Sequence, residues 1–386
     1  MASAKMKILM LFSTSIPPAD GIARHVVSLS KKLRERGHEV ILMTRGGMFF
    51  QESQFDGFRL ILVPFCPLYP FHVHLQKALI NGYVGSLAGK VDIAHLHSPL
   101  VPALDIKIPI VATFHTTMIV DTAKIENVGI KSLAIKIMGR TTSYWVEKRI
   151  ARSAAAIIAP SPEVKLELLK YYLRGDKHVD VLYNTVDSRV FSPGGNAVRG
   201  KIVLYVGRLS YRKGLFDLIE SAKYIVRVHG DAEFRIVGDG PLRGEVEKSV
   251  HDNGLRRYFT YCGEVTGEER VREEYRNASV VVIPSHYESG PITFLEAMSS
   301  GKAVVTTPVG YAKDLAVHRV NALVVPPSKP RELSKAVIEL LLDPDLANRI
   351  GAEARRTILE KVDAERTVTD LEGIYRRVLE NGRRVC

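Results

Sequence analysis

The sequence predicts an α/β protein of two domains. A chain of 386 residues with 46% apolar composition is long enough for two domains of ~150 to 200 residues each. Residues 280–307 read as a strand, a helix and a second strand, and residues 7–44 show the same alternation. Such alternation favours parallel sheets covered by helices. We therefore expect two α/β domains in succession.

The N-terminal stretch predicts a strand, a loop and a helix that could hold phosphate. Residues 7–12 are apolar and strand-like, and Val26, Leu29 and Leu33 then recur at helical spacing. The intervening loop contains proline and Gly21. In doubly wound sheets, phosphate binds at such a loop before a helix N-terminus. The backbone amide of Gly21 is therefore a candidate phosphate contact.

Three histidines accompany the next two predicted strands. His95 and His97 lie in strand-like residues 93–96 and just beyond, and His115 follows residues 111–114. An H-x-H pair is compatible with zinc, but no third ligand lies at a recognisable spacing. The simpler interpretation is that these histidines belong to the core or to its rim.

The most informative stretch begins with a buried strand at 280–283, where four apolar β-branched residues follow one another. Gly290-Pro291 then predicts a helix start, with proline at the first helical position. Glu288 lies before this helix and Glu296 in its second turn. At ~1.5 Å per residue, the helical part alone separates the two carboxylates by ~7 Å. They are too far apart to act as one acid/base couple.

The same spacing suits an extended ligand with an anionic middle. The free amides of Gly290, Ile292 and Thr293 and the positive end of the helix dipole favour phosphate. A nucleotide diphosphate-sugar has this shape, with hydroxyls at both ends and a charged bridge between them. The alternative is a solvated helix with two incidental glutamates.

Glu288 and Glu296, within PSHYESGPITFLEAMSSGKAVV, resemble the E-x7-E signature of the family 4 retaining glycosyltransferases. The chain is similar to the phosphatidylinositol mannosyltransferase-like and glycogen-synthase-like enzymes of that family. The resemblance implies the GT-B fold, in which two Rossmann-like domains with parallel sheets face each other. It also implies that Glu288 holds the sugar hydroxyls and Glu296 the ribose.

Further segments resemble the family in the expected order. ATFHTTM resembles the segment whose histidine faces the transferred sugar, which implies that His115 contacts the sugar, with His97 a weaker candidate on the acceptor side. Gly207-Arg208 and Lys213 resemble the family's diphosphate grip, although a surface arginine and lysine are usually only solvated. Two cations there would stabilise the departing phosphate.

The resemblance also implies a set of donor-binding residues. YCGEV, which ends at Val265, resembles the segment whose backbone contacts the base. Where the family usually has two glycines near the N-terminus, this chain has Asp20 and Gly21. The expected catalytic residues are His115, Arg208, Lys213 and Glu288, and the expected donor-binding residues are Gly21, Gly207, Val265, Gly290, Pro291, Ile292, Thr293 and Glu296.

The expected domains are 1–190 for the acceptor, 200–363 for the donor, and a helix at 364–386 that returns to the first domain. Asn184-Thr185-Val186-Asp187 resembles the family's crossing between domains, with Thr185 where glycine is usual. Pro193-Gly194-Gly195-Asn196 then reads as the linker. No metal and no cofactor are expected. Asp343-Pro344-Asp345 looks like a metal-binding D-x-D motif but is better interpreted as a turn after a helix.

The net charge and the cysteine content indicate which classes of partner and which cellular compartment are favoured. A net charge of +12 and a pI near 9.5 favour acidic partners. Three separated cysteines favour a reducing, cytoplasmic compartment.

Residues 124–152 carry seven basic and two acidic residues among apolar ones. This composition suits an amphipathic helix on the anionic inner face of a membrane, or an ordinary solvated helix. Basic and aromatic residues are interleaved only near Tyr144-Trp145, which argues against nucleic acid.

We therefore expect a retaining, metal-independent glycosyltransferase. It would move a hexosyl group from a UDP- or GDP-sugar to a hydroxyl of a lipid or glycan. The alternatives are a sugar-nucleotide epimerase on the same fold and a non-catalytic sugar-nucleotide-binding protein.

Overall fold

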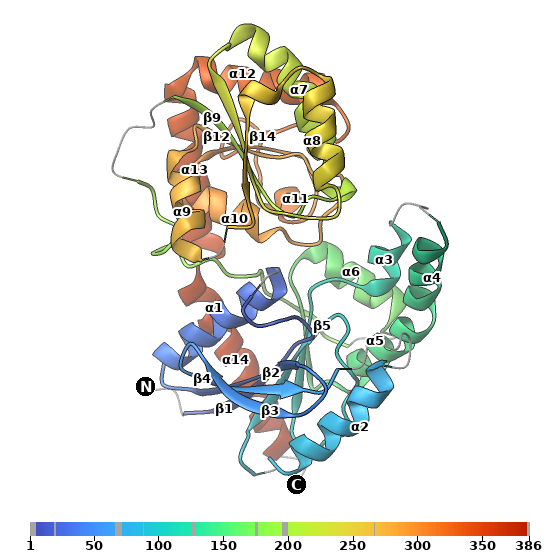
Figure 1. Ribbon diagram of the computed structural model, residues 1–386. Helices are drawn as coiled ribbons and strands as arrows, with labels where there is room; N and C mark the ends of the chain where they lie inside the picture. Colours follow the sequence, from blue (N-terminus) through green and yellow to red (C-terminus); the bar gives the residue numbers. More distant parts are fainter. Residues whose placement is uncertain are drawn as a thin grey trace. The chain divides into compact units, whose positions relative to one another are not determined.

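The chain forms two compact units (Figure 1). A computed structural model describes residues 5–18, 21–65, 72–87, 89–124, 129–173, 177–194, 200–265 and 267–383. The first unit comprises Met1–Asn184 and Ala364–Cys386, and the second comprises Thr185–Asp363. Both are α/β, as the sequence predicts.

The first unit is built on an eight-stranded sheet with the order β3-β4-β2-β1-β5-β6-β7-β8. Its strands are β1 (Lys7–Leu11), β2 (Glu39–Arg45), β3 (Gln51–Phe55), β4 (Phe58–Val63), β5 (Ile93–Ser98), β6 (Ile110–Phe114), β7 (Ala156–Ala159) and β8 (Asp180–Val181). Its helices are α1 (Gly21–Glu35), α2 (His72–Gly85), α3 (Met118–Ala123), α4 (Gly129–Arg140), α5 (Thr142–Ser153), α6 (Pro162–Tyr171) and α14 (Ala364–Arg383).

Helices cover both faces of this sheet because alternate residues of its strands point to opposite sides. Ile8 and Met10 of β1 pack with apolar residues of α1 and α14. Leu9 and Leu11 face the other way, into a core shared with α2, α5 and α6. Figure 1 shows α1 and α14 on one side of the sheet and α2 and α5 on the other.

One pairing departs from the expected parallel arrangement. β3 and β4 are antiparallel, and Phe55 pairs with Phe58 across the connection. The two residues between them, Asp56 and Gly57, have positive φ angles of 52° and 75°. An Asp-Gly pair in this conformation makes a tight hairpin turn whose twist matches that of the strands.

The second unit has a six-stranded, wholly parallel sheet with the order β11-β10-β9-β12-β13-β14. Its strands are β9 (Lys201–Val206), β10 (Ala232–Val237), β11 (Phe259–Gly263), β12 (Val280–Ile283), β13 (Ala303–Thr306) and β14 (Leu323–Val324). Its helices are α7 (Leu215–Val228), α8 (Arg243–Asp252), α9 (Glu268–Asn277), α10 (Ile292–Ser299), α11 (Tyr311–Leu315), α12 (Pro330–Leu342) and α13 (Pro344–Lys361), with short 3₁₀ turns at Tyr211–Lys213 and Arg256–Tyr258.

The chain passes between the units at Asn184–Thr185, earlier than the expected linker at 193–196. The stretch before Pro193 belongs to the second unit because its backbone is bound there. Ser299 Oγ donates to the carbonyl of Phe191 at 2.7 Å, and Arg355 donates to the same oxygen at 3.2 Å. Gly195 and Asn196 lie outside the described residues.

The C-terminal helix α14 belongs to the first unit. Tyr375 is fully buried there, and its hydroxyl lies 2.7 Å from His95 Nδ1. Glu372 Oε1 lies 2.9 Å from His38 Nε2. These buried polar contacts fix the helix against β5 and the segment before β2.

Asp343-Pro344-Asp345 is a helix start and not a simple turn. Asp343 is the N-cap of α13, and its carboxylate accepts a hydrogen bond from the amide of Leu346 at 2.9 Å. Pro344 occupies the first helical position, where its missing amide costs nothing. The sequence pattern for a turn and for an N-cap is the same here, since both use aspartate before proline.

Candidate functional site

The expected donor residues of the second unit follow the carboxyl ends of neighbouring parallel strands. Gly207 and Arg208 come directly after β9, Val265 follows β11, and Glu288 follows β12. The amide of Gly207 donates to the carbonyl of Val237 at the end of β10. Since ligands of open α/β sheets bind outside the carboxyl ends of the strands, these residues lie at the edge where a ligand is expected.

Arg208 is exposed, and its backbone is tied to the same edge. The hydroxyl of Tyr205 donates to the carbonyl oxygen of Arg208 at 3.1 Å. Burial, with a smaller contribution from the Glu288 carboxylate, raises the pKa of Tyr205. Within the described residues, no salt bridge holds the Arg208 guanidinium. Its charge is therefore available to a ligand.

Gly214 lets the turn that carries Lys213 approach the loop after β12. Gly214 has a φ of 66°, and a Cβ at this position would collide with the carbonyl oxygen of Pro284. The amide of His286 also donates to the carbonyl of Arg212 at 2.8 Å. Only glycine combines this backbone conformation with this close approach. Lys213 is thereby held beside the segment that contains Glu288.

Lys213 and Glu288 form an ion pair. Lys213 Nζ lies 2.5 Å from Glu288 Oε1, and the Ser285 hydroxyl donates to the same oxygen at 2.9 Å. The two charged side chains are 22% and 12% exposed. A cation expected to hold phosphate and a carboxylate expected to hold sugar hydroxyls are therefore neighbours in one unit.

The start of α10 lies four residues beyond Glu288. Pro291 is the N-cap, with ψ near 114°, and the helix begins at Ile292. This corrects the expectation of proline at the first helical position by one residue. The first-turn amides of Ile292 and Thr293 have no acceptor within the helix, as at any helix start. Gly290 is required because a Cβ there would meet the ring of Tyr311 at 2.5 Å.

Glu296 is buried. The alternative of a solvated helix with incidental glutamates would instead place it on an exposed face. The Tyr275 hydroxyl donates to Glu296 Oε2 at 2.9 Å. Only 2% of Glu296 is exposed, and every residue of α10 is buried. A carboxylate is costly to bury unless it is bonded, so Tyr275 stabilises it there.

The expected residues of the first unit form a separate group around four buried histidines. His115 follows β6, and its Nε2 lies 3.1 Å from Nδ1 of His97. His25 of α1 packs edge-on against His115, with ring centroids 5.3 Å apart. Gly21 begins the same helix, α1, and Asp20 lies outside the described residues.

These histidines are uncharged near neutral pH. Burial lowers the pKa of His115 to about 4 and that of His95 to about 3. Burial, and the neighbouring imidazoles, also lower the pKa values of His25 and His97. Neutral imidazoles donate and accept hydrogen bonds, so His115 can contact sugar hydroxyls without carrying charge.

The fold supplies the third histidine that the sequence spacing did not reveal. Ligand atoms of His25, His97 and His115 all lie within 4.8 Å of one another. Three neutral imidazoles are chemically suitable for Zn²⁺. In this structure, Nδ1 of His97 and Nε2 of His115 are hydrogen-bonded to each other. No local pattern pointed to His25, since it comes from a distant helix.

Sequence reasoning also missed Glu147, which anchors the loops beside the histidines. Its Oε1 accepts from the Ser98 hydroxyl at 3.0 Å, and its Oε2 accepts from the amide of Met118 at 3.0 Å and from the Tyr172 hydroxyl at 2.6 Å. Burial raises the pKa of Glu147 to about 7 despite these bonds. Glu147 of α5 thus holds the residue after His97 and the start of α3.

Two family models match successive parts of the chain. The Glycosyltransferase Family 4 model matches residues 19–190, and the model of Glycosyl transferases group 1 matches residues 189–357. The chain belongs to the family 4 glycosyltransferases. The family resemblance of the sequence motifs is therefore confirmed.

Relatives of this glycosyltransferase extend over nearly its whole length. Phosphatidyl-myo-inositol mannosyltransferase of Mycobacterium leprae is 27% identical and covers 98% of this chain and 99% of its own. Sucrose-phosphate synthase from Thermosynechococcus elongatus superposes with a TM-score of 0.81 at 21% identity, over 98% and 100% of the two chains. Anabaena Alr3699/HepE, solved in complex with UDP and glucose, superposes with a TM-score of 0.73 at 17% identity. The match covers 96% of this chain and 99% of the HepE chain. The fold is GT-B, as expected.

Proposed function

We propose that this glycosyltransferase moves a hexosyl group from a UDP- or GDP-sugar to a hydroxyl of a lipid or glycan, with retention of anomeric configuration and without a metal. It would act in the cytoplasm, at the inner membrane face when the acceptor is a lipid. In this proposal the second unit binds the donor and the first unit the acceptor.

One observation carries the donor assignment. Lys213 and Glu288 are paired at 2.5 Å, and Glu288 lies four residues before Ile292, whose amide opens α10. A cation and a helix start suit a diphosphate, and a carboxylate suits sugar hydroxyls. The UDP bound to the related HepE chain supports a nucleoside diphosphate.

Each remaining residue then has a role that its position permits. Arg208 and Lys213 stabilise the charge that develops on the departing phosphate. Glu288 holds hydroxyls of the sugar, while Glu296 holds the ribose and Val265 lies beside the base. His115, uncharged, contacts the sugar from the first unit. No carboxylate is assigned as a covalent nucleophile, so attack occurs on the front face and the donor phosphate accepts the acceptor's proton.

Peripheral contact with anionic lipid through residues 124–152 belongs to the same proposal. The M. leprae relative, named for transfer to phosphatidyl-myo-inositol, supports a lipid acceptor. Within the described part of the chain, none of the helices combines the length and the apolar character needed to span a bilayer.

A thermal-shift screen against UDP-, GDP- and ADP-sugars tests the donor, because a ligand that binds only the folded state raises the melting temperature. The expected result is a rise with one UDP- or GDP-sugar. No shift with any nucleotide sugar would overturn the donor assignment.

Product analysis with the donor so identified tests the reaction. Retention at the transferred carbon is expected, and an inverted linkage would reject the mechanism. Release of an altered free sugar nucleotide without an acceptor would instead identify an epimerase.

A further inference from the structure

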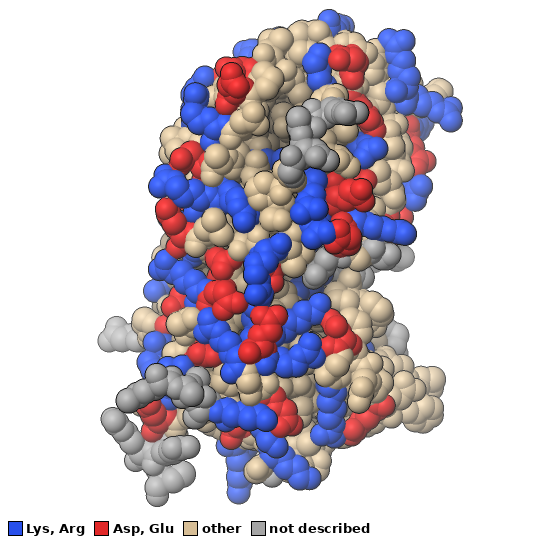
Figure 2. Space-filling view, turned by 90° about the vertical axis from the view of Figure 1, so that its left-hand side faces the viewer, with Lys and Arg blue, Asp and Glu red and all other residues tan. Residues whose placement is uncertain are grey.

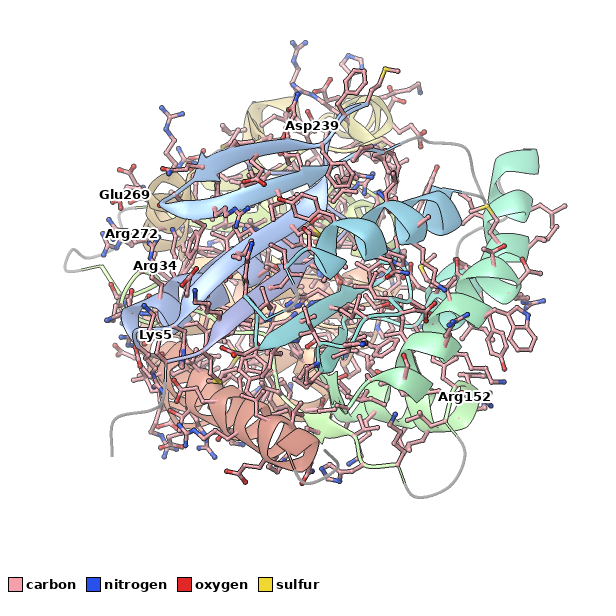
Figure 3. The ribbon with its side chains drawn as sticks, turned by 90° about the horizontal axis from the view of Figure 1, so that it is seen from below. Lys5, Arg34, Arg152, Asp239, Glu269 and Arg272 are labelled. Atoms are coloured by element: carbon pink, nitrogen blue, oxygen red, sulfur yellow. The ribbon has the colours of Figure 1, made fainter. Side chains whose placement is uncertain are left out.

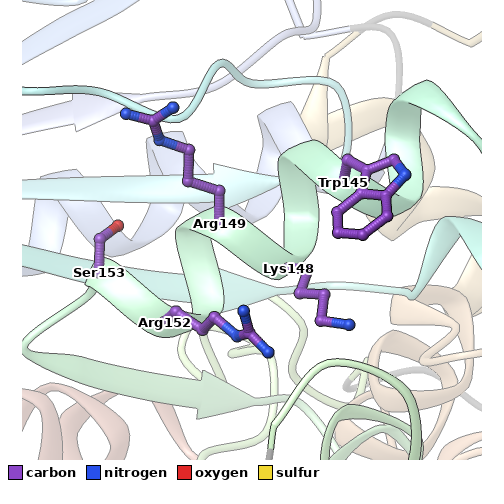
Figure 4. Close-up of a pocket in the computed structure, with 5 residues that line it drawn as sticks. All are labelled: Trp145, Lys148, Arg149, Arg152 and Ser153. Carbon is purple, nitrogen blue, oxygen red and sulfur yellow. The ribbon is translucent and has the colours of Figure 1, made fainter.

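The outer side of α5 carries a continuous row of basic and aromatic side chains. Trp145, Lys148, Arg149 and Arg152 are spaced i, i+3, i+4 and i+7, so they lie on one face of the helix. With Ser153 they line a surface hollow of about 310 Å³ (Figure 4). We call these four residues the α5 outer face. Figure 3 shows Arg152 of α5 and Arg34 of α1 on opposite sides of the first unit's sheet.

The charge of the α5 outer face is only partly neutralised. Asp105 accepts from Arg149 at 2.8 Å and pairs with Lys77 at 2.6 Å, so two cations share one carboxylate. Lys148 donates to the Tyr144 hydroxyl at 2.6 Å, and this uncharged partner does not neutralise its positive charge. Among the described residues, Arg152 has no acidic partner. The hollow is therefore positive.

On another part of the surface, basic and acidic residues are mixed. In the view of Figure 2, lysine and arginine side chains are interspersed with aspartate and glutamate. Between α1 and α14, for example, Arg36 bonds both Glu365 and Glu372. The α5 outer face, by contrast, carries three basic side chains beside the single carboxylate of Asp105.

Large apolar side chains accompany this charge. Trp145 is 64% exposed, and Lys148 Nζ lies 5.2 Å from the centre of its ring. On α4, which packs against α5, Leu133 and Ile137 are one turn apart and 56% and 54% exposed. Tryptophan beside lysine and arginine, with aliphatic residues nearby, is the composition that favours the boundary between headgroups and acyl chains.

The inner side of α5 connects this surface to the histidine group. Glu147 lies on the opposite side of the helix, where it is buried and bonds Ser98 and Met118. These residues belong to the end of β5, beside His97, and to the start of α3, just after His115. The helix that presents the basic row therefore also positions the segments that hold the expected acceptor-side residues.

From the charge excess, the exposed tryptophan and the exposed aliphatic residues, we infer that the α5 outer face docks on an anionic lipid bilayer. Trp145 lies among the headgroups, and Lys148, Arg149 and Arg152 contact lipid phosphates. Binding of single-stranded nucleic acid uses several aromatic side chains that stack on successive bases, and the α5 outer face contains only Trp145. The inference narrows the proposed membrane contact to one helix face, and docking requires no nucleotide sugar.

The chain's single tryptophan makes this surface directly observable. The full-length protein is titrated, without nucleotide, with vesicles of phosphatidylcholine alone or mixed with phosphatidylglycerol. We expect the Trp145 emission to shift to the blue only with the anionic vesicles, and the shift to weaken at high salt as the charges are screened. An unchanged emission with anionic vesicles would overturn the inference.

Charge reversal tests the basic row. Lys148→Glu with Arg152→Glu should weaken sedimentation with anionic vesicles by about 25-fold or more, since each basic contact near an anionic surface contributes ~5-fold. Lys90→Glu with Lys361→Glu makes the same charge change at exposed sites that do not belong to α4 or α5 and should stay within about 5-fold of the parent. Equal loss in both double variants would show a net-charge effect and reject the α5 outer face as the docking site.

Two further measurements separate lipid docking from loss of folding and from nucleic acid binding. Circular dichroism and the melting temperature establish that the α5 variant is folded. An oligonucleotide that shifts the Trp145 emission while anionic vesicles do not would identify nucleic acid binding and reject the inference. Because none of these assays measures transfer, their failure leaves the proposed transferase reaction intact, and failure of the reaction leaves docking intact.

Discussion

Lys213 Nζ and Glu288 Oε1 are 2.5 Å apart in the second unit. The cation expected to bind the donor phosphate is thus neutralised by the carboxylate expected to bind the donor sugar. A donor that enters must share or replace this ion pair. The pair keeps both side chains ordered beside the start of α10 until the diphosphate and the sugar provide new partners.

Removal of either cation should slow transfer strongly. Arg208→Ala and Lys213→Ala are each expected to lower kcat by ~100-fold or more, because single electrostatic groups contribute on this scale to charge developed in a transition state. The measurement is kcat with the donor found by the thermal-shift screen.

Arg212 provides the matched control. It precedes Lys213 and is exposed, with its guanidinium 6.0 Å from the ring centre of Tyr287. Arg212→Ala should retain activity within about 3-fold. Near-normal turnover in both Arg208→Ala and Lys213→Ala would remove their assignment to the diphosphate.

Glu288→Gln should separate binding of the nucleotide from transfer of the sugar. Loss of the carboxylate releases Lys213, so the affinity for the nucleoside diphosphate alone should be unchanged or a few-fold higher. Turnover should fall by ~100-fold, since the sugar loses a charged hydrogen-bond acceptor. Calorimetric titration with UDP or GDP beside rate measurements checks both parts. Weaker nucleotide binding would contradict this account of the ion pair.

Glu147 should make the stability of the first unit depend on pH. Its pKa is raised to about 7 from an ordinary value of 4.5, so the folded state favours the protonated carboxyl. This contribution to the free energy of unfolding is fully present below pH 4.5 and is lost as pH rises through 7. At ~1.4 kcal/mol per pKa unit, the loss is at most ~3.5 kcal/mol.

Denaturant unfolding of Glu147→Gln from pH 4.5 to pH 8 measures this effect. Relative to the variant, the parent protein should lose stability across that range, and the buried histidines cancel in the difference because both proteins contain them. Glu380→Gln, at an exposed site on α14, serves as the control. Parallel pH profiles for the parent and Glu147→Gln would show that the carboxyl is not perturbed by burial.

Metal removal should leave transfer unchanged. Protein treated with a strong chelator is expected to keep its full rate with the identified donor, because the expected roles of Arg208 and Lys213 supply the positive charge at the phosphate. Lost activity that Zn²⁺ restores in the parent, but not in His25→Ala, would reject metal independence. It would instead identify His25, His97 and His115 as a functional metal site.

Local sequence patterns were sufficient for most of the fold. Continuous apolar runs marked β1, β12 and β13 because strands buried on both faces require them. The β3–β4 hairpin was missed although Asp56-Gly57 is a strong hairpin signal, since the alternation of β3 is weak and its residues are mostly exposed. The crossing between the domains at Asn184–Asp187 was located from its resemblance to the family. The glycine and proline near 193 suggested a linker that lies beyond the start of the second unit, where long-range bonds hold Phe191.

In the candidate site, too, local features could be predicted from the sequence and long-range contacts could not. Residues within one loop and helix, such as Glu288 and Pro291, could be located from their spacing. Contacts that join distant segments could not. Tyr275 meets Glu296 from a different helix, and His25 meets His115 only because α1 packs on the sheet beside β5 and β6. No local pattern encodes such partners, since they depend on the tertiary fold.

The return of α14 to the first unit determines how the protein can be divided. A fragment that stops at Asn184 would lack Val368, Leu371 and Tyr375, and would leave the apolar surface of Ile8 and Met10 open to water. The first unit is therefore not a contiguous gene segment. Exchange of second units between relatives requires replacement of 185–363 as an internal cassette, with both ends of the recipient chain retained.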